Sequence, residues 1–234
     1  ILGFLNILEC CRKYKVNNLI YASSSSVYGG NRNLPYKENN SVDHPVSFYA
    51  ATKKSNEIMA HSFSHLYGVP STGLRFFTVY GPWGRPDMAP MIFSKAIMEG
   101  KPIEVFNFGK MKRDFTFIDD VVQGIYKCCK KPATSDVAFD YMNPNPSTSY
   151  APHRIFNLGN NSTTDLLYFI ELLEKNLGKK AKMVLKPMQN GDVTETSADT
   201  TLLNKWIGYK SVTSIENGIM KFSRWFLDFY GYSN

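Results

Sequence analysis

The chain has 234 residues, of which 43% are hydrophobic and 20% are charged. These fractions exclude a disordered, collagenous or coiled-coil protein and predict a packed core. The formal net charge is +7, but the lysines are scattered, so charge alone favours neither nucleic acid nor an anionic small molecule as a ligand. Because no membrane-spanning run or signal-peptide pattern is present, we expect a soluble protein without a membrane span.

The cysteines and histidines give no pattern of a metal site. Two adjacent cysteine pairs, at 10–11 and 128–129, lie in apolar helical patterns, which predicts core thiols in a reducing compartment. His61 and His65 share a helix face, but Ser62 stands where the zinc-protease motif needs Glu. We therefore expect neither disulfides nor a bound metal.

The first third of the chain alternates helix and strand. Apolar spacing predicts a helix at the very start, over residues 2–11, with no capping residue before it, so we expect the sequence to begin inside a longer protein. A buried strand is predicted at 18–23, a helix at 47–66 and a second strand at 71–78. A strand, a crossover helix and a strand indicate a parallel sheet with helices on its faces.

The rest of the chain continues the alternation without an internal repeat. Further helices are predicted at 91–98, 119–129, 164–177 and 214–229, and strands at 103–106, 154–158 and 182–185. Residues 113–118 are predicted to form a turn, and residues 132–152, rich in Pro, Ser and Asn, a surface excursion. We expect an α/β fold, with half of a Rossmann-like parallel sheet up to about residue 80 and a smaller α/β lobe beyond it.

A Tyr-x-x-x-Lys pattern carries the clearest chemical signal. Tyr49 and Lys53 are four residues apart and so share one helix face. Tyrosine is a poor base near neutral pH, but a fixed cation beside it stabilises the phenolate. The pattern alone is weak, since it also occurs by chance as an ordinary amphipathic pair.

A run of four serines, at 23–26, strengthens this interpretation. It follows the predicted strand at 18–23, and ligands of open α/β sheets bind beyond the carboxyl ends of the strands. A serine-rich turn that only satisfies its own backbone is the alternative. A hydroxyl run one loop before Tyr49 makes that alternative much weaker.

Five segments together resemble the extended short-chain dehydrogenase/reductases of the sugar-nucleotide epimerase/dehydratase family, and among them most of all the UDP-glucuronate 4-epimerases. The resemblance covers the whole chain. Its carriers are Tyr21-Ala-Ser-Ser-Ser-Ser-Val-Tyr-Gly29, Asp43-His-Pro-Val-Ser-Phe-Tyr-Ala-Ala-Thr-Lys53, Leu74-Arg-Phe-Phe-Thr-Val-Tyr-Gly-Pro-Trp-Gly-Arg-Pro-Asp-Met88, Arg113-Asp-Phe-Thr-Phe-Ile-Asp-Asp120 and Met188-Gln-Asn-Gly-Asp192.

The resemblance implies an isomerase with NAD as cofactor and a catalytic set of three residues. Tyr49 would be the general base at the C4 hydroxyl, Lys53 would hold the nicotinamide ribose and stabilise the phenolate, and Ser24 would relay the proton. The implied cofactor contacts are Ala22, Ser23, Tyr49, Lys53 and Phe76. The reaction would be conversion of UDP-glucuronate to UDP-galacturonate through a 4-keto sugar, supplying polysaccharide biosynthesis.

The implied substrate contacts favour this reaction over others in the family. Where the related dehydratases carry Asp and Glu, and the decarboxylases Glu, this chain has Ser25 and Ser26, which cannot do that proton chemistry near neutral pH. Arg113 would clamp the diphosphate and Arg85 would bind the uronate or the nucleotide. The full set is Ser24, Ser25, Ser26, Thr78, Arg85, Arg113 and Asp192; Gln189 and Asn190 depart from the family's usual Arg and Pro.

The family's glycine-rich dinucleotide fingerprint does not occur in these 234 residues. We therefore expect residues 1–80 to be the C-terminal part of an NAD-binding Rossmann domain and 81–234 to form mainly the substrate lobe, with some segments returning to the Rossmann domain. The chain alone is expected to be poorly active. The resemblance also implies a cytoplasmic homodimer that pairs through residues 1–13 and 47–66, without nucleic acid.

Two alternatives remain open at the level of sequence. One is a UDP-glucose or UDP-N-acetylhexosamine 4-epimerase, which would differ in whether the pocket around Arg85 prefers a 6-carboxylate. The other is a non-catalytic fragment that binds a nucleotide sugar. Binding of UDP without NAD would identify the second alternative.

Overall fold

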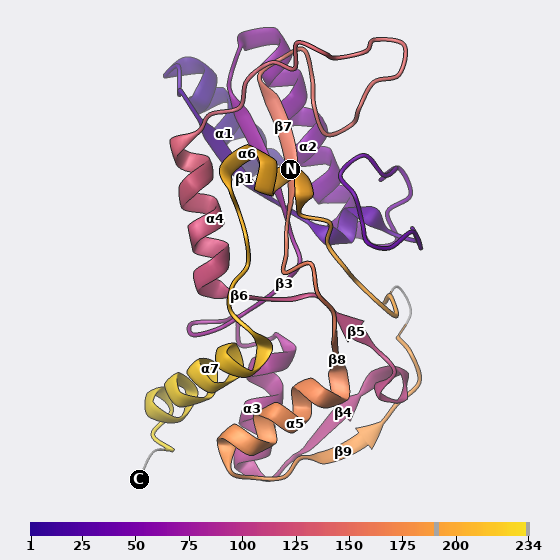
Figure 1. Cartoon of the computed structure of the whole chain (residues 1–234), viewed down its shortest axis with the longest axis vertical. Coiled ribbons are helices and arrows are strands. Elements are labelled where there is room, and N and C mark those ends of the chain that lie inside the picture. The colour runs from indigo at the N-terminus through magenta and orange to yellow at the C-terminus, as the bar shows by residue number, and fades with distance from the viewer. Residues whose placement is uncertain (190–191, 233–234) are drawn as a thin grey trace. The chain divides into compact units, whose positions relative to one another are not determined.

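The computed structural model describes residues 1–189 and 192–232, and these form two compact units. Unit 1 comprises residues 1–77, 122–159 and 198–210, and unit 2 comprises, among the described residues, 78–121, 160–189, 192–197 and 211–232. Figure 1 labels the elements of both. Each unit is described by itself.

Unit 1 is built on a three-stranded parallel sheet. The strands lie in the order β1 (Leu19–Ser24), β2 (Ser71–Phe76) and β7 (His153–Leu158), and all three end at one edge, with Ser24 opposite Phe76 and Phe76 opposite Leu158. Helices α1 (Leu2–Lys13) and α2 (Phe48–Tyr67) pack against each other, and α2 packs along the sheet. Because β2 is buried and pairs with both other strands, the carboxyl ends of the three strands are held side by side.

Helix α2 has clear start and stop signals. The Ser47 hydroxyl accepts a hydrogen bond from the Ala50 amide at 3.1 Å, which satisfies one of the amides left open at a helix start. Gly68 ends the helix in the left-handed region, with φ +67°, a conformation that favours glycine. These two residues determine where α2 begins and ends.

In its described residues, unit 2 contains three small two-stranded sheets and three α-helices that lie wholly within it. The parallel pairs are β3 (Thr78–Tyr80) with β6 (Phe115–Phe117) and β4 (Pro102–Val105) with β9 (Lys182–Leu185), and the antiparallel pair is β5 (Lys112–Arg113) with β8 (Thr164–Asp165). Helices α3 (Ala89–Glu99), α5 (Leu166–Leu177) and α7 (Ile215–Phe229) enclose an aromatic-rich core. In that core, the rings of Phe115 and Phe169 stack with centroids 4.3 Å apart.

The described residues confirm a mixed α/β fold with a parallel sheet. Helix α4 (Ile118–Lys130) runs from unit 2 into unit 1, and residues 131–152 contain no helix or strand, as expected. The predicted strand at 71–78 is instead divided: β2 ends at Phe76 and β3 begins at Thr78 with a different partner strand. Likewise, the predicted turn at 113–118 contains β6, and helix α6 (Thr201–Ile207) was not predicted.

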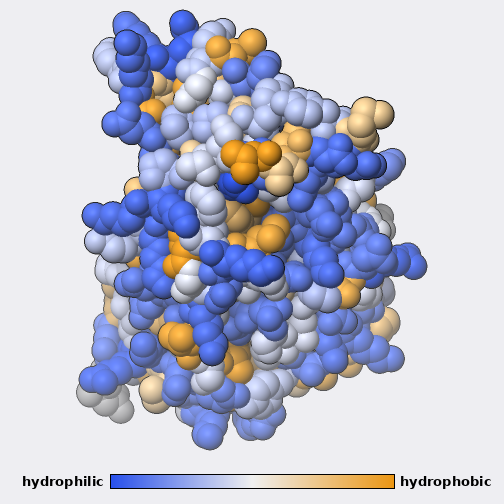
Figure 2. Space-filling view, turned by 45° about the horizontal axis from the view of Figure 1, so that its top comes forward, coloured by the Kyte–Doolittle hydropathy of each residue, from blue (hydrophilic) through white to orange (hydrophobic). Residues whose placement is uncertain are grey.

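One face of the molecule is mostly hydrophilic (Figure 2). Figure 2 shows one face, on which hydrophobic residues occur in separate small groups among hydrophilic ones. Among the described residues, no helix is both long enough and apolar enough to cross a membrane.

Candidate functional site

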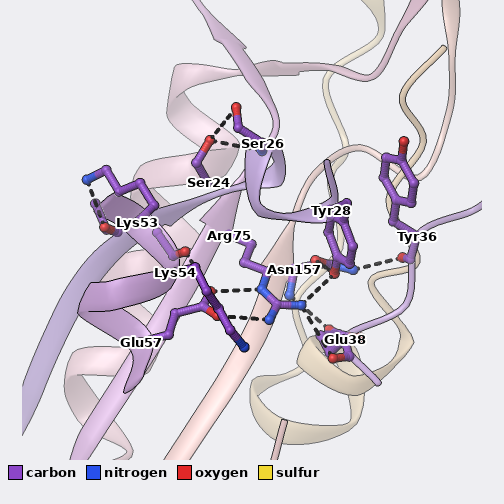
Figure 3. A network of polar contacts seen from close by, with 12 residues as sticks. Ser24, Ser26, Tyr28, Tyr36, Glu38, Lys53, Lys54, Glu57, Arg75 and Asn157 are labelled. Atoms are coloured by element: carbon purple, nitrogen blue, oxygen red, sulfur yellow. Dashed lines mark hydrogen bonds and ion pairs between the residues drawn. The ribbon is translucent and has the colours of Figure 1, made fainter. Parts of the chain in front are cut away.

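The serine run begins where β1 ends. Ser24, 9% exposed, caps a short 3-10 helix, η1 (Ser25–Tyr28): its Oγ accepts a hydrogen bond from the Ser26 amide at 3.2 Å and donates to Ser26 Oγ at 3.1 Å. Ser25 is half-buried and Ser26 is exposed. The hydroxyls of Ser24 and Ser26 are therefore held together at the carboxyl edge of the sheet (Figure 3).

Tyr49 and Lys53 lie one turn apart on α2. Tyr49 is 52% exposed, and the Lys53 ammonium lies 5.7 Å from the centroid of its ring. Lys53 Nζ also donates a hydrogen bond of 3.1 Å to the carbonyl of Ala22, two residues before Ser24. Lys53 therefore contacts both Tyr49 and the end of β1.

A buried ion pair lies directly beneath this edge. Arg75, on β2, is fully buried and forms two hydrogen bonds with the Glu57 carboxylate, Nε to Oε1 at 2.9 Å and Nη2 to Oε2 at 3.0 Å. Ser23 Oγ donates to the same Oε1 at 2.6 Å. Burial acts to lower the pKa of Arg75, but the hydrogen bonds and charge of Glu57 outweigh it and raise that pKa.

The network continues from Arg75 into the loop before α2. Arg75 Nη1 donates to Tyr28 Oη at 3.0 Å, and Tyr28 Oη donates to Asn157 Oδ1 at 2.6 Å. The backbone amide of Asn157 donates to a carboxylate oxygen of Glu38 at 2.8 Å. Burial raises the pKa of Glu38 to about 7, because the residue is only 1% exposed and its charged carboxylate is therefore poorly hydrated.

Sequence reasoning missed this network although two signals point to it. Arg75 interrupts an apolar run that predicts a buried strand, and a buried guanidinium needs a carboxylate partner. Glu57 lies one turn beyond Lys53 on the face already assigned to Tyr49 and Lys53. Together these signals could have paired Glu57 with Arg75.

Unit 2 holds a second group of predicted residues. Arg113 Nη2 donates to Asp192 Oδ1 at 2.9 Å, and Nη1 donates to the carbonyls of Lys112 and Thr194 at 3.1 and 3.2 Å. The structure therefore brings together Arg113 and Asp192, which lie 79 residues apart in sequence. Asn190 and Gly191, which belong to the predicted Met188 to Asp192 segment, lie outside the described residues.

The remaining predicted residues of unit 2 lie in two places. The Thr78 amide donates to the carbonyl of Asp114 at 3.1 Å, next to Arg113. The Asp114 carboxylate, fully buried, accepts hydrogen bonds from the amides of Asn160 and Asn161 at 2.7 and 3.1 Å and so shapes the loop at 159–161. Arg85 lies in an exposed loop, where its guanidinium forms an ion pair with Asp87.

The residues at the end of β1 fit the nicotinamide half of a dinucleotide. The Lys53 ammonium has three N–H donors, and one of them binds the carbonyl oxygen of Ala22. Ala22 itself is exposed at the edge of the sheet. Phe76 is half-buried at the end of β2, whereas the Ser23 hydroxyl is directed inward to Glu57. Among residues 1–189 and 192–232, no group of three or more His, Cys, Asp and Glu side chains is arranged to hold a metal ion.

Comparison with known proteins gives matches over nearly the whole chain. A family model described as "NAD dependent epimerase/dehydratase family" matches residues 1–159. Protein CapI of Staphylococcus aureus is 52% identical over 98% of this chain and 69% of its own length. A probable UDP-glucuronate 4-epimerase of Rhizobium meliloti is 43% identical over 97% of this chain and 67% of its own length. UDP-glucuronate 4-epimerase 1 of Arabidopsis thaliana is 44% identical, and the chain spans only 54% of it.

Solved structures also resemble the chain over nearly its whole length. The UDP-glucuronic acid 4-epimerase of Bacillus cereus, crystallised with UDP-glucuronic acid and NAD, matches with a TM-score of 0.84 and 30% identity over 98% of this chain and 68% of that one. A UDP-glucose 4-epimerase of Thermotoga maritima with UDP-glucose matches with a TM-score of 0.84, 27% identity and coverage of 98% and 70%. The chain therefore corresponds to about two thirds of each of these two proteins.

Proposed function

Because the chain belongs to the NAD dependent epimerase/dehydratase family, we propose that the protein that carries it is a UDP-sugar 4-epimerase, and that it interconverts UDP-glucuronate and UDP-galacturonate. The relatives and solved structures that resemble it include UDP-sugar 4-epimerases, and several of these are named as UDP-glucuronate 4-epimerases. The observation that carries the proposal is the Lys53 side chain, which contacts both Tyr49 and the strand end that bears the serine run.

The proposed chemistry assigns one role to each residue at this edge. Tyr49 Oη accepts the proton of the sugar C4 hydroxyl, and Lys53 stabilises the phenolate and holds the nicotinamide ribose. Ser24 donates a hydrogen bond to the reacting oxygen and relays its proton. When bound, NAD supplies reversible oxidation at C4. Ala22 and Phe76 line the position proposed for it, and Ser23, whose hydroxyl is directed inward to Glu57, would contribute only its backbone.

The uronate is proposed on the basis of the two serines that follow Ser24. A 4-keto uronic acid is a β-keto acid that loses CO₂ readily when a nearby acid assists. Ser25 and Ser26 are neutral, so they could hold the carboxylate by hydrogen bonds without supplying that acid. The same neutrality argues against dehydration, which needs an acid and a base at these positions.

The nucleotide is proposed to bind through unit 2. A planar guanidinium suits paired phosphate oxygens, and Arg113 is held in place by Asp192 and two carbonyl groups. Thr78 would contact the sugar, Asp192 would lie near the uridine ribose, and Arg85 would bind the uronate or the nucleotide. We further propose that residues 1–80 belong to the NAD-binding domain and most of 81–234 to the substrate lobe.

The experiment is a ¹H NMR assay of the full natural-length protein with NAD and, separately, UDP-glucuronate, UDP-glucose and UDP-N-acetylglucosamine. The proposal predicts a new anomeric signal of UDP-galacturonate and at least about 10-fold lower kcat/KM for the two neutral sugars. Preference for UDP-glucose would instead support the activity of the Thermotoga maritima protein. Binding of UDP without turnover of any of the three sugars would contradict an epimerase and support a non-catalytic nucleotide-sugar-binding fragment.

A further inference from the structure

Glu57 lies two helical turns from Tyr49 and one turn from Lys53 on the same side of α2. Its side chain is 2% exposed and reaches the end of β1, where Ser23 Oγ donates to it at 2.6 Å. Lys53, one turn earlier, donates to the carbonyl of Ala22. Two successive turns of the helix therefore hold two successive residues of the strand, immediately before Ser24.

Arg75 connects the same carboxylate to the segment that follows Ser24. Its Nε and Nη2 bind Glu57, while Nη1 donates to Tyr28 Oη at 3.0 Å and to the carbonyl of Glu38 at 3.3 Å. The guanidinium carbon also lies 4.9 Å from the centroid of the Tyr28 ring. The 3-10 helix that Ser24 caps is thus anchored at its last residue by the group that holds Glu57 (Figure 3).

Stability alone is a weak explanation for this ion pair. Burial of two charges costs several kcal/mol for each ion, and well-packed apolar residues of similar volume often give equal or greater stability. The geometry offers a better explanation, because a bidentate pair of guanidinium and carboxylate restricts the placement of β2 relative to α2. Ser23, bound to the same Oε1, extends that placement to β1.

We propose that the buried Glu57–Arg75 pair is a positioning device, which fixes the helix that carries Tyr49 and Lys53 against the strand end that carries Ser24. Neither residue touches the substrate or the cofactor; both act through the placement of Lys53 and Ser24. This inference rests on the proposed function. It predicts that the pair matters for turnover more than for stability or for binding of the UDP-sugar.

The test replaces the pair with apolar residues of similar size in the full natural-length protein. The double variant Glu57→Leu/Arg75→Met is expected to keep the wild-type circular dichroism spectrum and a Tm within a few degrees. Its kcat is expected to fall at least about 10-fold, because small misplacements of reacting groups are costly, while the KM for the UDP-sugar changes less than about 3-fold. Glu57→Gln, which keeps the shape but not the charge, is expected to lose less activity than the double variant.

A matched control and a second readout keep the test decisive. Glu174→Gln removes the carboxylate of another ion pair, the one with Lys180 in unit 2, and is expected to leave kcat unchanged. Hydrogen exchange is expected to accelerate at residues 22–28 of the double variant and to stay unchanged in unit 2. If the double variant does not fold, Glu57→Gln decides: unchanged kcat and exchange in that variant would overturn the proposal.

The outcomes separate this inference from the function on which it rests. An active wild-type protein with a folded double variant whose kcat lies within 2-fold of it would overturn the positioning role alone. A wild-type protein inactive on all three UDP-sugars would refute the proposed function. In that case, unchanged exchange at residues 22–28 in the double variant would also overturn the positioning role.

Discussion

The three serines that follow Ser23 have different environments, and this difference limits what each can do. Ser24 is nearly buried and its hydroxyl donates a hydrogen bond to Ser26 Oγ, whereas Ser25 is half-buried and Ser26 is exposed. Ser24 is therefore held in one place, as a proton relay requires. Ser25 and Ser26 are more open to a ligand, as contacts to a sugar carboxylate require.

Replacement of Tyr49 by Phe tests the proposed base. The variant loses only the hydroxyl, and because general base catalysis contributes typically 10²- to 10⁴-fold, kcat is expected to fall by about that factor. The KM for the UDP-sugar and the Tm should change little, since Tyr49 is 52% exposed. Tyr67→Phe, on the same helix and 50% exposed, is the control and should retain activity. Comparable kcat in both variants would exclude Tyr49 as the base.

Replacement of Glu38 by Gln tests the buried carboxylate. Burial raises the pKa of Glu38 to about 7 from its ordinary 4.5, so its protonated form favours the folded state. That stabilisation is complete below about pH 4.5 and is lost as the pH rises through 7. Glu38→Gln keeps a side-chain oxygen that can accept the hydrogen bond from the backbone amide of Asn157, but it cannot ionise. Its free energy of unfolding relative to wild type should therefore be higher at pH 8 than at pH 5 by about 1 to 3 kcal/mol.

Chemical denaturation at the two pH values provides this measurement. Glu104→Gln, which removes an exposed carboxylate in unit 2, serves as the control and should show little pH dependence. A difference between Glu38→Gln and wild type that is the same at pH 5 and pH 8 would show that Glu38 ionises normally in the folded protein.

At the scale of elements, the register of β1 against β2 determines which side chains meet at the sheet edge. Tyr21 lies opposite Gly73 in this register, and the Tyr21 ring covers the glycine. The Tyr21 side chain packs with Leu8 of α1 and Ala60 of α2 in one hydrophobic cluster. The absence of a side chain at residue 73 therefore allows the helices to lie close to the sheet.

Gly73→Ala should be clearly destabilising. An added Cβ would lie 2.6 Å from Tyr21 Oη and 2.7 Å from Cζ, so the ring must move within a packed core. Such overpacking typically costs about 1 to 3 kcal/mol. Thermal unfolding measures the effect, and Gly30→Ala, whose Cβ would meet its nearest neighbour at 3.7 Å, is the control. Equal Tm values for the two variants would mean that the Tyr21 ring does not cover residue 73.

At the scale of the whole molecule, α1 and α2 expose apolar side chains that a second copy could cover. Ile7 is 51% exposed on α1, and Ile58 and Leu66 are 55% and 64% exposed on one face of α2. The two helices pack against each other, and exposed apolar side chains that gather on neighbouring elements are typical of an interaction surface. We propose that the protein is a homodimer that pairs through residues 1–13 and 47–66.

The double variant Ile58→Glu/Leu66→Glu should shift the protein from dimer to monomer. Two charges in an apolar interface cannot be buried without a large desolvation cost. Light scattering after size-exclusion chromatography measures the mass. Val137→Glu, at a fully exposed position in residues 132–152, should leave the dimer intact. A monomeric wild-type protein would exclude the dimer. A dimeric double variant would show that the interface lies elsewhere.

The sequence was most informative where one pattern decided the structure. The helix predicted at 47–66 agrees with α2 to within one residue at each end, because the capping hydroxyl of Ser47 and the left-handed Gly68 that bound it are local signals. The division at Phe77 was missed, because the change of partner from β7 to β6 depends on tertiary pairing and leaves the apolar pattern unbroken. The contact between Arg113 and Asp192 was not predicted for the same reason, because it depends on tertiary structure and no local spacing indicates it.

The measurement that tests the central claim most directly follows the reaction from both directions. The full natural-length protein, supplied with NAD, is incubated with UDP-glucuronate in one tube and with UDP-galacturonate in another, and ¹H NMR records both sugars over time. Reversible epimerisation at C4 predicts that both tubes reach the same ratio of the two UDP-uronates and that Tyr49→Phe slows both approaches. No interconversion in either tube, or an irreversible loss of uronate with release of CO₂, would contradict the proposed 4-epimerase.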